Sequence, residues 1–307
     1  MSHDRDEPAT HYEVLVVGAG AAGLAAAAFL GRCKRKVAVI GLADRANSSA
    51  AKVHNLPFAE GVTPEKLYAT MEAELAEFGV VVLRQEVEKI QVDDDLRRVQ
   101  VFTAAGQITG ARLLLATGLD YDVPSWVPAE AWGKSVFTCP FCHASDHEGE
   151  AFAVVGADAQ AVHTALLCAA HASTLTVVVA DPAAAQSPEA DHIRSIGGEV
   201  VVDTVADAEL LSTGEVEMVT AGGRRIHAGA VLLLGVIRAR KTLSEMLGLP
   251  PSWTGLPEVD REGRSQHPLI WVAGNAAMPY YLLVESMGSG IRAGISIHKD
   301  LTTELVK

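Results

Sequence analysis

The segment Cys139-Pro140-Phe141-Cys142-His143 contains the residues of this chain best suited to chemistry. Two residues separate the cysteines, so their sulfurs can close a small disulfide ring, and pairs with this spacing often have a lowered thiol pKa. Pro140 fixes one backbone dihedral and stiffens the spacer. A Cys-x-x-Cys near a βαβ pattern indicates a redox-active dithiol.

Two other readings of this pair stay open. One is a structural disulfide or a pair of inert thiols. The other is a zinc site, for which Cys139, Cys142, His143 and His147 offer four ligands. Tetrahedral coordination is strained by the adjacency of Cys142 and His143, and the usual second ligand pair lies about a dozen residues away or more. The redox reading is favoured, and no metal is expected.

The composition limits the class of protein. The chain has 307 residues, of which 49% are hydrophobic and 5% aromatic. This is enough for one large or two medium α/β domains. A net charge of −13 argues against binding to nucleic acid or to an anionic membrane surface. Residues 1–12 lack the pattern of a signal peptide, and no apolar run suits a membrane span. We therefore expect a soluble cytoplasmic protein. Cys33 and Cys168 are expected to be small buried side chains.

A strand, a glycine-rich turn, a helix and a second strand open the chain. The strand at 13–17 runs into Gly18-Ala19-Gly20-Ala21-Ala22-Gly23, followed by an Ala-rich helix over 24–30 and a strand over 36–40. This is the context of a dinucleotide fingerprint. Gly18 makes the tight turn, Gly20 admits a pyrophosphate, and Gly23 permits close helix–strand packing. The second strand normally ends in an acid that holds the ribose, but Gly41 stands there, so Asp44 or Asn47 is expected to take over.

A second βαβ pattern begins at residue 152, but its turn has different chemistry. The turn reads Gly156-Ala157-Asp158, with Ala161 at the sixth position. Asp158 would place a side chain and a negative charge where a backbone should approach a pyrophosphate. No arginine cluster follows to receive a 2′-phosphate. We expect a nucleotide-binding fold that has lost its nucleotide; the alternative is an NAD site that uses Asp181.

Other elements follow from hydrophobic periodicity. Helices are predicted over 64–78, 159–170, 238–247 and 284–305. Strands are predicted near 80–83, 87–92, 99–103, 113–115, 175–179, 200–217, 225–234 and 269–272.

Four motifs together resemble the low-molecular-weight thioredoxin-reductase-like flavoproteins over nearly the whole chain. They are the turn at Gly18, Ala116-Thr117-Gly118, the Cys-x-x-Cys and Ala273-Gly274-Asn275. The closest similarity is to the dithiol oxidases of the gliotoxin and holomycin type. It depends on His54-Asn55-Leu56-Pro57, on the segment 132–137 that leads into the Cys-x-x-Cys, and on Ala161-Val162-His163. Unlike true thioredoxin reductases, the chain has His143, Asp158 and Asn275 at diagnostic positions and lacks an arginine motif.

The resemblance implies an α/β fold of two Rossmann-like domains. We expect a discontinuous FAD domain at 1–117 plus 248–307, a domain at 118–247 that carries the Cys-x-x-Cys, and a homodimer. The expected FAD contacts come from the glycine turns and nearby loops: Gly18, Gly20, Ala21, Ala22, Gly23, Asp44, Asn47, His54, Ala116, Thr117, Gly118, Gly274 and Asn275.

The resemblance also implies that Cys142 faces the flavin and that Cys139 meets a small-molecule dithiol, with O2 as the final acceptor. Thiol exchange needs a thiolate, so a base must stand nearby. His143 is best placed by sequence and is expected to have a pKa near the working pH; His147 and His54 are lesser candidates. The substrate groove is expected near 55–60, 121–132 and 278–283, and Trp126, Tyr280 and Tyr281 suggest a flat apolar ligand. A nicotinamide-dependent disulfide reductase and a non-catalytic flavin-fold binding protein remain as alternatives.

Overall fold

The computed structural model describes residues 11–279 and 282–304 and divides the chain into two compact units. Unit 1 comprises the chain up to Ala46, Glu65–Asp120 and the chain from Arg238 onward. Unit 2 comprises Asn47–Pro64 and Tyr121–Ile237. The predicted boundaries gave residues 47–64 to the first domain, whereas their contacts group them with the second.

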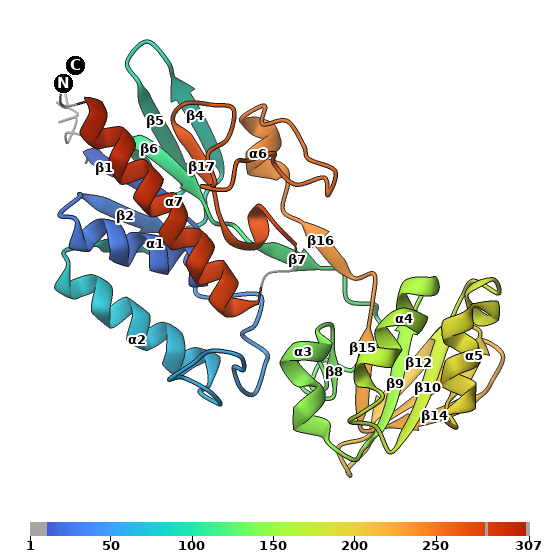
Figure 1. Ribbon diagram of the computed structural model, residues 1–307. Coiled ribbons are helices and arrows are strands. Elements are labelled where there is room, and N and C mark those ends of the chain that lie inside the picture. The colour runs from blue at the N-terminus through green and yellow to red at the C-terminus, as the bar shows by residue number, and fades with distance from the viewer. Residues whose placement is uncertain (1–10, 280–281, 305–307) are drawn as a thin grey trace, which may run out of the picture. The chain divides into compact units, whose positions relative to one another are not determined.

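Unit 1 is a Rossmann-like sheet whose three longest helices pack on one face (Figure 1). The strand order is β3-β2-β1-β6-β5-β4, with β17 also paired to β6. Strands β1, β2, β3, β6 and β17 are parallel, and β4 and β5 add an antiparallel meander. The strands are β1 (His11–Val17), β2 (Val37–Ile40), β3 (Val81–Leu83), β4 (Lys89–Asp93), β5 (Arg98–Thr103), β6 (Gly106–Leu115) and β17 (Ile270–Val272).

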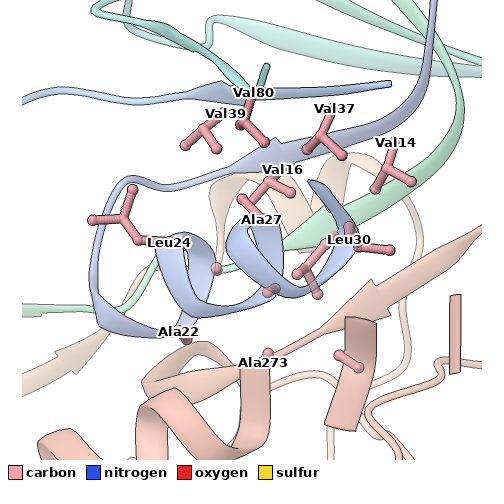
Figure 2. Close-up of a cluster of buried hydrophobic side chains, with 14 of the residues drawn as sticks. Val14, Val16, Ala22, Leu24, Ala27, Leu30, Val37, Val39, Val80 and Ala273 are labelled. Atoms are coloured by element: carbon pink, nitrogen blue, oxygen red, sulfur yellow. The ribbon is translucent and has the colours of Figure 1, made fainter. Parts of the chain in front are cut away.

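The helices of unit 1 are α1 (Ala21–Arg32), α2 (Pro64–Glu77), α6 (Thr242–Met246), α7 (Leu283–Glu304) and the short 3₁₀ turn η3 (Gly274–Ala276). Helices α1, α2 and α7 share one hydrophobic core with the sheet. Figure 2 shows this core, with Val14, Val16 and Val39 of the strands against Leu24 and Leu30 of α1. Because β-branched residues suit strands and Ala and Leu suit helices, each element has a composition that favours its observed structure.

Unit 2 has a five-stranded parallel sheet of order β11-β10-β9-β15-β8. Helices α4 and α5 pack on one face, and the antiparallel sheet β12-β13-β14 packs on the other. The strands are β8 (Val136–Phe137), β9 (Ala151–Gly156), β10 (Thr174–Val179), β11 (Glu199–Val202), β12 (Val205–Leu210), β13 (Val216–Thr220), β14 (Arg225–Ala228) and β15 (Ala230–Leu233). The helices are α3 (Pro140–His143), η1 (Ala144–His147), α4 (Ala159–Cys168), η2 (Ala184–Gln186) and α5 (Pro188–Ser195).

The helix predicted over 238–247 is wrong in its first half. Residues Ile237–Ala239 form strand β16, which pairs with β7 (Leu119–Tyr121), and only Thr242–Met246 is helical. Arg240 pairs with Asp120 across this ribbon. The long-range pairing therefore overrides the helix propensity of the local sequence. The predicted α/β class is confirmed. Cys168 is buried as expected, but Cys33 is only partly so.

Candidate active site

The Cys-x-x-Cys forms a disulfide at the start of helix α3. Cys139 has an extended backbone and caps the helix, Pro140 occupies its first turn, and Cys139 and Cys142 are joined sulfur to sulfur. Pro is well placed there because the first helical N–H has no intrahelical partner. Both cysteines are partly exposed, and Phe141 between them is 64% exposed. The pair is therefore accessible to a small reactant.

His143 lies against the aromatic ring of Phe137, with 5.0 Å between ring centroids. Burial is the main cause that lowers its pKa to about 4; the charge of Asp146 opposes this shift, and the nearby His147 and His54 contribute to it. The expectation of a pKa near the working pH is therefore not met, because a ring packed on apolar surface disfavours the charged form. At neutral pH His143 is uncharged and can accept a proton, although it is a weak base.

The other two candidate histidines have both ring nitrogens engaged. His147 stacks on Phe137, with Nδ1 2.8 Å from Glu150 Oε2 and Nε2 3.2 Å from the carbonyl oxygen of Lys134. His54 Nδ1 contacts Glu60, and its Nε2 lies 2.9 Å from Asp146 Oδ2. His147 is therefore held in place by packing, whereas His54 connects a distant segment to the dithiol helix.

The fingerprint turn of unit 1 fits the diphosphate of a dinucleotide. Gly18 has φ +118°, and a Cβ there would lie 2.1 Å from the carbonyl oxygen of Ala116. A Cβ at Gly23 would lie 2.0 Å from the carbonyl oxygen of Gly18. Apart from its two chain neighbours, no described residue has an atom within 4 Å of a Cβ built on Gly20, and within the described chain no side chain caps α1 there. The N–H groups of the first helical turn, which includes Ala21 and Ala22, can therefore receive a phosphate.

The other predicted cofactor residues of unit 1 meet at the same edge of the sheet. The N–H of Ala116 donates to Val17, and the N–H of Ala273 donates to Leu115, so the ends of β1, β6 and β17 lie together. Gly274 has φ +65° and packs against Ala22. The strand end of β6 leads through Thr117 to Gly118, which has φ +70°. Asn275 Oδ1 accepts a hydrogen bond from Ser286 at 2.9 Å.

The end of β2 is arranged differently from the usual ribose site. A Cβ at Gly41 would lie 2.8 Å from the backbone nitrogen of Ala19, so this position has no room for an acidic side chain. Asp44 is exposed in the loop that follows. Arg45, which no sequence motif indicated, donates from Nε to the carbonyl oxygen of Ala19 at 2.7 Å and lies over the ring of Tyr68. A cation thus connects this loop to the fingerprint turn, and the ribose role of Asp44 stays a prediction.

The predicted site residues fall into two sets. The glycine turns and Asp44 belong to unit 1, whereas Asn47 and His54 belong with Cys139, Cys142 and His143 to unit 2. Trp126 packs against the core between the two sheets of unit 2. Tyr280 and Tyr281 lie outside the described residues. Asp146 and Glu60, which hold His54, carried no recognisable motif.

The turn of the second βαβ unit is closed by a carboxylate. Asp158 is the N-cap of α4, and its side chain accepts a hydrogen bond from the N–H of Gln160 at 2.9 Å. A Cβ at Gly156 would lie 2.8 Å from that of Ala161, so strand and helix pack as closely as in a nucleotide-binding unit. The carboxylate of Asp181 accepts from the N–H of Ala183 at 2.9 Å. The carboxylates of Asp158 and Asp181 therefore both accept hydrogen bonds from backbone N–H groups of their own turns.

Neither a metal cluster nor a membrane-spanning helix is found among the described residues. Within 11–279 and 282–304, no group of three or more His, Cys, Asp and Glu side chains is arranged to hold a metal ion. Over the same residues, no helix combines the length and apolar character that crossing a bilayer requires.

Comparison with known proteins identifies the class. Residues 12–293 match the model of the family described as pyridine nucleotide-disulphide oxidoreductase. The chain therefore belongs to this family, and it is a thioredoxin-reductase-like member, as the sequence motifs predicted. Family members of this kind are FAD flavoproteins, in agreement with the fit of the fingerprint turn.

The individual proteins that this chain resembles are similar to it at low sequence identity, and some of them over only part of its length. A thioredoxin reductase named sirT from Leptosphaeria maculans is 30% identical over 142 residues, which are 45% of this chain and 43% of that protein. A bifunctional thioredoxin reductase/thioredoxin from Mycobacterium leprae is 29% identical over 176 residues, which are 55% of this chain and 38% of that protein. The chain thus spans less than half the length of these curated relatives. The crystal structure of HlmI has a TM-score of 0.88 at 25% identity, covering 96% of this chain and 94% of that one.

Proposed function

We propose that this chain is an FAD-dependent dithiol oxidase, which closes an intramolecular disulfide in a small-molecule dithiol and uses O2 as the acceptor, giving H2O2. The observation that carries the proposal is the Asp158 carboxylate at the N-terminus of α4. It occupies the hydrogen-bonding position that a nicotinamide dinucleotide needs for its diphosphate. The disulfide of Cys139 and Cys142 is meanwhile partly exposed. The thiols of the substrate, rather than the hydride of a nicotinamide, would then supply the electrons.

The exchange balances as a transfer of two electrons and two protons. A substrate thiolate attacks Sγ of Cys139, a mixed disulfide forms, and Cys142 leaves as a thiolate. The second substrate thiolate then attacks the substrate sulfur of the mixed disulfide, and Cys139 leaves as the product is released. The substrate is oxidised and the enzyme is left as a dithiol. The assignment of Cys139 as the attacked sulfur follows from the resemblance to dithiol oxidases.

Residues of this chain would supply the dithiol and the cofactor site. His143 follows Cys142 and is uncharged at neutral pH, but a pKa lowered to about 4 makes it a poor acceptor for the proton of a substrate thiol. The turn at Gly18, Gly20 and Gly23 and the start of α1 would hold the FAD diphosphate. Bound FAD supplies a two-electron acceptor for the enzyme dithiol and the reactivity with oxygen that yields H2O2.

The proposal is tested by asking which reductant reaches the flavin. The FAD-containing protein is mixed without oxygen with a small dithiol, with NADH or with NADPH, and the visible flavin absorbance is followed. The dithiol should bleach the flavin, and the nicotinamides should not. With air present, the dithiol should drive oxygen uptake and peroxide formation, whereas a monothiol at equal thiol concentration should be far slower. Rapid bleaching by NADH or NADPH would instead identify a disulfide reductase, and a protein that retains no FAD would be a non-catalytic binding protein.

A further inference from the structure

The loop at residues 53–62 is closed on itself by backbone hydrogen bonds. The N–H of Val53 donates to Val62 at 2.8 Å, and the N–H of Gly61 donates to Val53 at 2.8 Å. Within it, Asn55 and Phe58 have φ of +57° and +69°. Residues other than glycine rarely adopt such φ values, so other interactions must hold the backbone of this loop in its conformation. We call residues 53–62 the histidine loop, after His54.

Two side chains of the histidine loop bind the segment that carries the dithiol. Nδ2 of Asn55 donates to the carbonyl oxygen of Phe141 at 2.8 Å, and Phe141 lies between the two cysteines. Nε2 of His54 lies 2.9 Å from Oδ2 of Asp146, in the turn η1 directly after α3. Both contacts lie within unit 2. The loop therefore contacts the middle and the end of the Cys-x-x-Cys segment.

His54 lies between two carboxylates. Glu60 contacts Nδ1 from the same loop, Asp146 contacts Nε2 from η1, and the histidine side chain is only 15% exposed. A neutral imidazole has one N–H and cannot donate to both acids, whereas the imidazolium can. Burial alone lowers the pKa of His54, but the hydrogen bond to Glu60 and the charge of Asp146 outweigh it, so the pKa is raised. The arrangement therefore favours a charged His54.

The charge of His54 matters because the dithiol must ionise. Exchange requires a thiolate, and a nearby negative charge raises a thiol pKa whereas a positive one lowers it. Asp146 is four residues beyond Cys142, and His143 on α3 is uncharged at neutral pH. Without His54, the carboxylate of Asp146, whose charge also acts on His143 beside Cys142, would have no histidine cation hydrogen-bonded to it.

We propose that His54 is a positioning residue of the dithiol site. With Asn55 it holds the histidine loop on the Cys-x-x-Cys segment, and through its ion pair with Asp146 it offsets a negative charge that would disfavour the cysteine thiolates. The inference rests on the proposed function, since it concerns the same dithiol. Its chemistry, thiolate formation, can nevertheless be measured without substrate or oxygen.

The test is the pH dependence of cysteine alkylation in the reduced, FAD-containing protein. Every variant carries Cys33→Ser, since Cys33 is partly exposed, whereas Cys168 is buried. The rate of iodoacetamide modification at each cysteine is measured by mass spectrometry over a pH series. His54→Gln should raise the apparent pKa of the faster-reacting cysteine by about 0.5–1 unit. Asp146→Asn should lower it, and the double variant should return close to the parent value.

The matched control is His227→Gln, which makes the same substitution. His227 also pairs with a carboxylate, Glu217 at 3.0 Å, but on the antiparallel sheet of unit 2. Its alkylation profile should match that of the parent. His54→Arg should restore part of the effect, since it returns a cation, and it also serves if His54→Gln folds poorly.

The outcomes separate the inference from the proposed function. An alkylation profile of His54→Gln equal to that of His227→Gln would overturn the inference, even if the parent protein oxidises dithiols. A double variant that keeps the raised thiol pKa of His54→Gln would also overturn it, because removing both members of the ion pair should return the thiol pKa close to the parent value. Conversely, a parent protein without oxidase activity whose thiol pKa shifts as expected would reject the proposed function and leave the role of His54 standing.

Discussion

The carboxylate of Asp158 accepts a hydrogen bond from the backbone N–H of Gln160 at 2.9 Å, at the first turn of α4. The corresponding turn of α1 in unit 1 begins at Gly20, which has no side chain to offer. Two turns of the same βαβ type thus differ in whether the chain or a ligand satisfies the helix N–H groups. This difference underlies the proposal that only unit 1 binds a nucleotide.

Asp158→Ala should destabilise the protein by about 1 kcal/mol, since it removes an N-cap. Asp158→Asn should leave the stability nearly unchanged, because Asn caps a helix as well as Asp does. Urea unfolding followed by circular dichroism measures both. Equal losses in the two variants would mean that the charge, not the cap, is what matters at this turn.

Gly290→Ala should destabilise unit 1 by about 1–3 kcal/mol through overpacking. A Cβ at Gly290 would lie 2.0 Å from the carbonyl oxygen of Ala22, so α7 must move away from α1. Gly288→Ala on the same helix is the control, because its Cβ meets only the end of Arg292 at 3.6 Å. Gly290→Ala should unfold at a lower denaturant concentration and retain less FAD on gel filtration, whereas Gly288→Ala should be neutral or stabilising. Parallel behaviour of the two would refute close packing at Gly290.

Asp300→Asn should destabilise the protein by about 2 kcal/mol, because it leaves a buried cation with one fewer partner. Arg112 is fully buried and pairs with Asp300 and Glu304, each at 2.6 Å. The loss is smaller than for a fully isolated charge, since Glu304 remains. Asp93→Asn is the control: its 4.0 Å pair with Arg98 is about one-third exposed and should contribute less than about 1 kcal/mol. Denaturant titration compares the two, and equal losses would contradict this account.

The contribution of Asp300 should also depend on pH. Burial alone raises the pKa of Asp300, but hydrogen bonds from Arg264 and Arg112 outweigh it and lower the pKa. A carboxyl whose pKa is lower in the folded state stabilises the fold above its unfolded pKa of about 3.9, and this contribution is lost as the pH falls through the folded value. The stability difference between the parent and Asp300→Asn should therefore be constant from neutral pH to about pH 5 and shrink below about pH 4. A difference that shrinks on raising the pH would have the wrong sign.

The order of the two cysteines is testable by trapping. Cys142→Ser, in a Cys33→Ser background, should accumulate a mixed disulfide at Cys139 when treated with a small disulfide reagent. Cys139→Ser should react more slowly, if Cys142 is the sulfur that faces the flavin. Intact mass spectrometry before and after reduction detects the adduct. Faster trapping at Cys142 would reverse the assigned roles.

Features that depend on a few adjacent residues could be predicted from the sequence. The turn at Gly18 needs positive φ and close approach to neighbouring strands, which only glycine permits, and the structure has both. The Cys139–Cys142 spacing similarly predicts a disulfide ring without knowledge of the fold. Even helix α5, which hydrophobic periodicity did not indicate, begins with a recognisable cap at Ser187 and Pro188.

Features that depend on residues far apart in the chain needed the tertiary structure. His54 and Asp146 are 92 residues apart, and nothing in either segment indicates that they meet. The strand at Ile237–Ala239 has a local sequence suited to a helix, and its pairing with Leu119–Tyr121 decides otherwise. The lowered pKa of His143 likewise comes from burial against Phe137. Local conformation follows from the residues themselves, whereas contact, burial and charge environment depend on which distant segments the fold brings together.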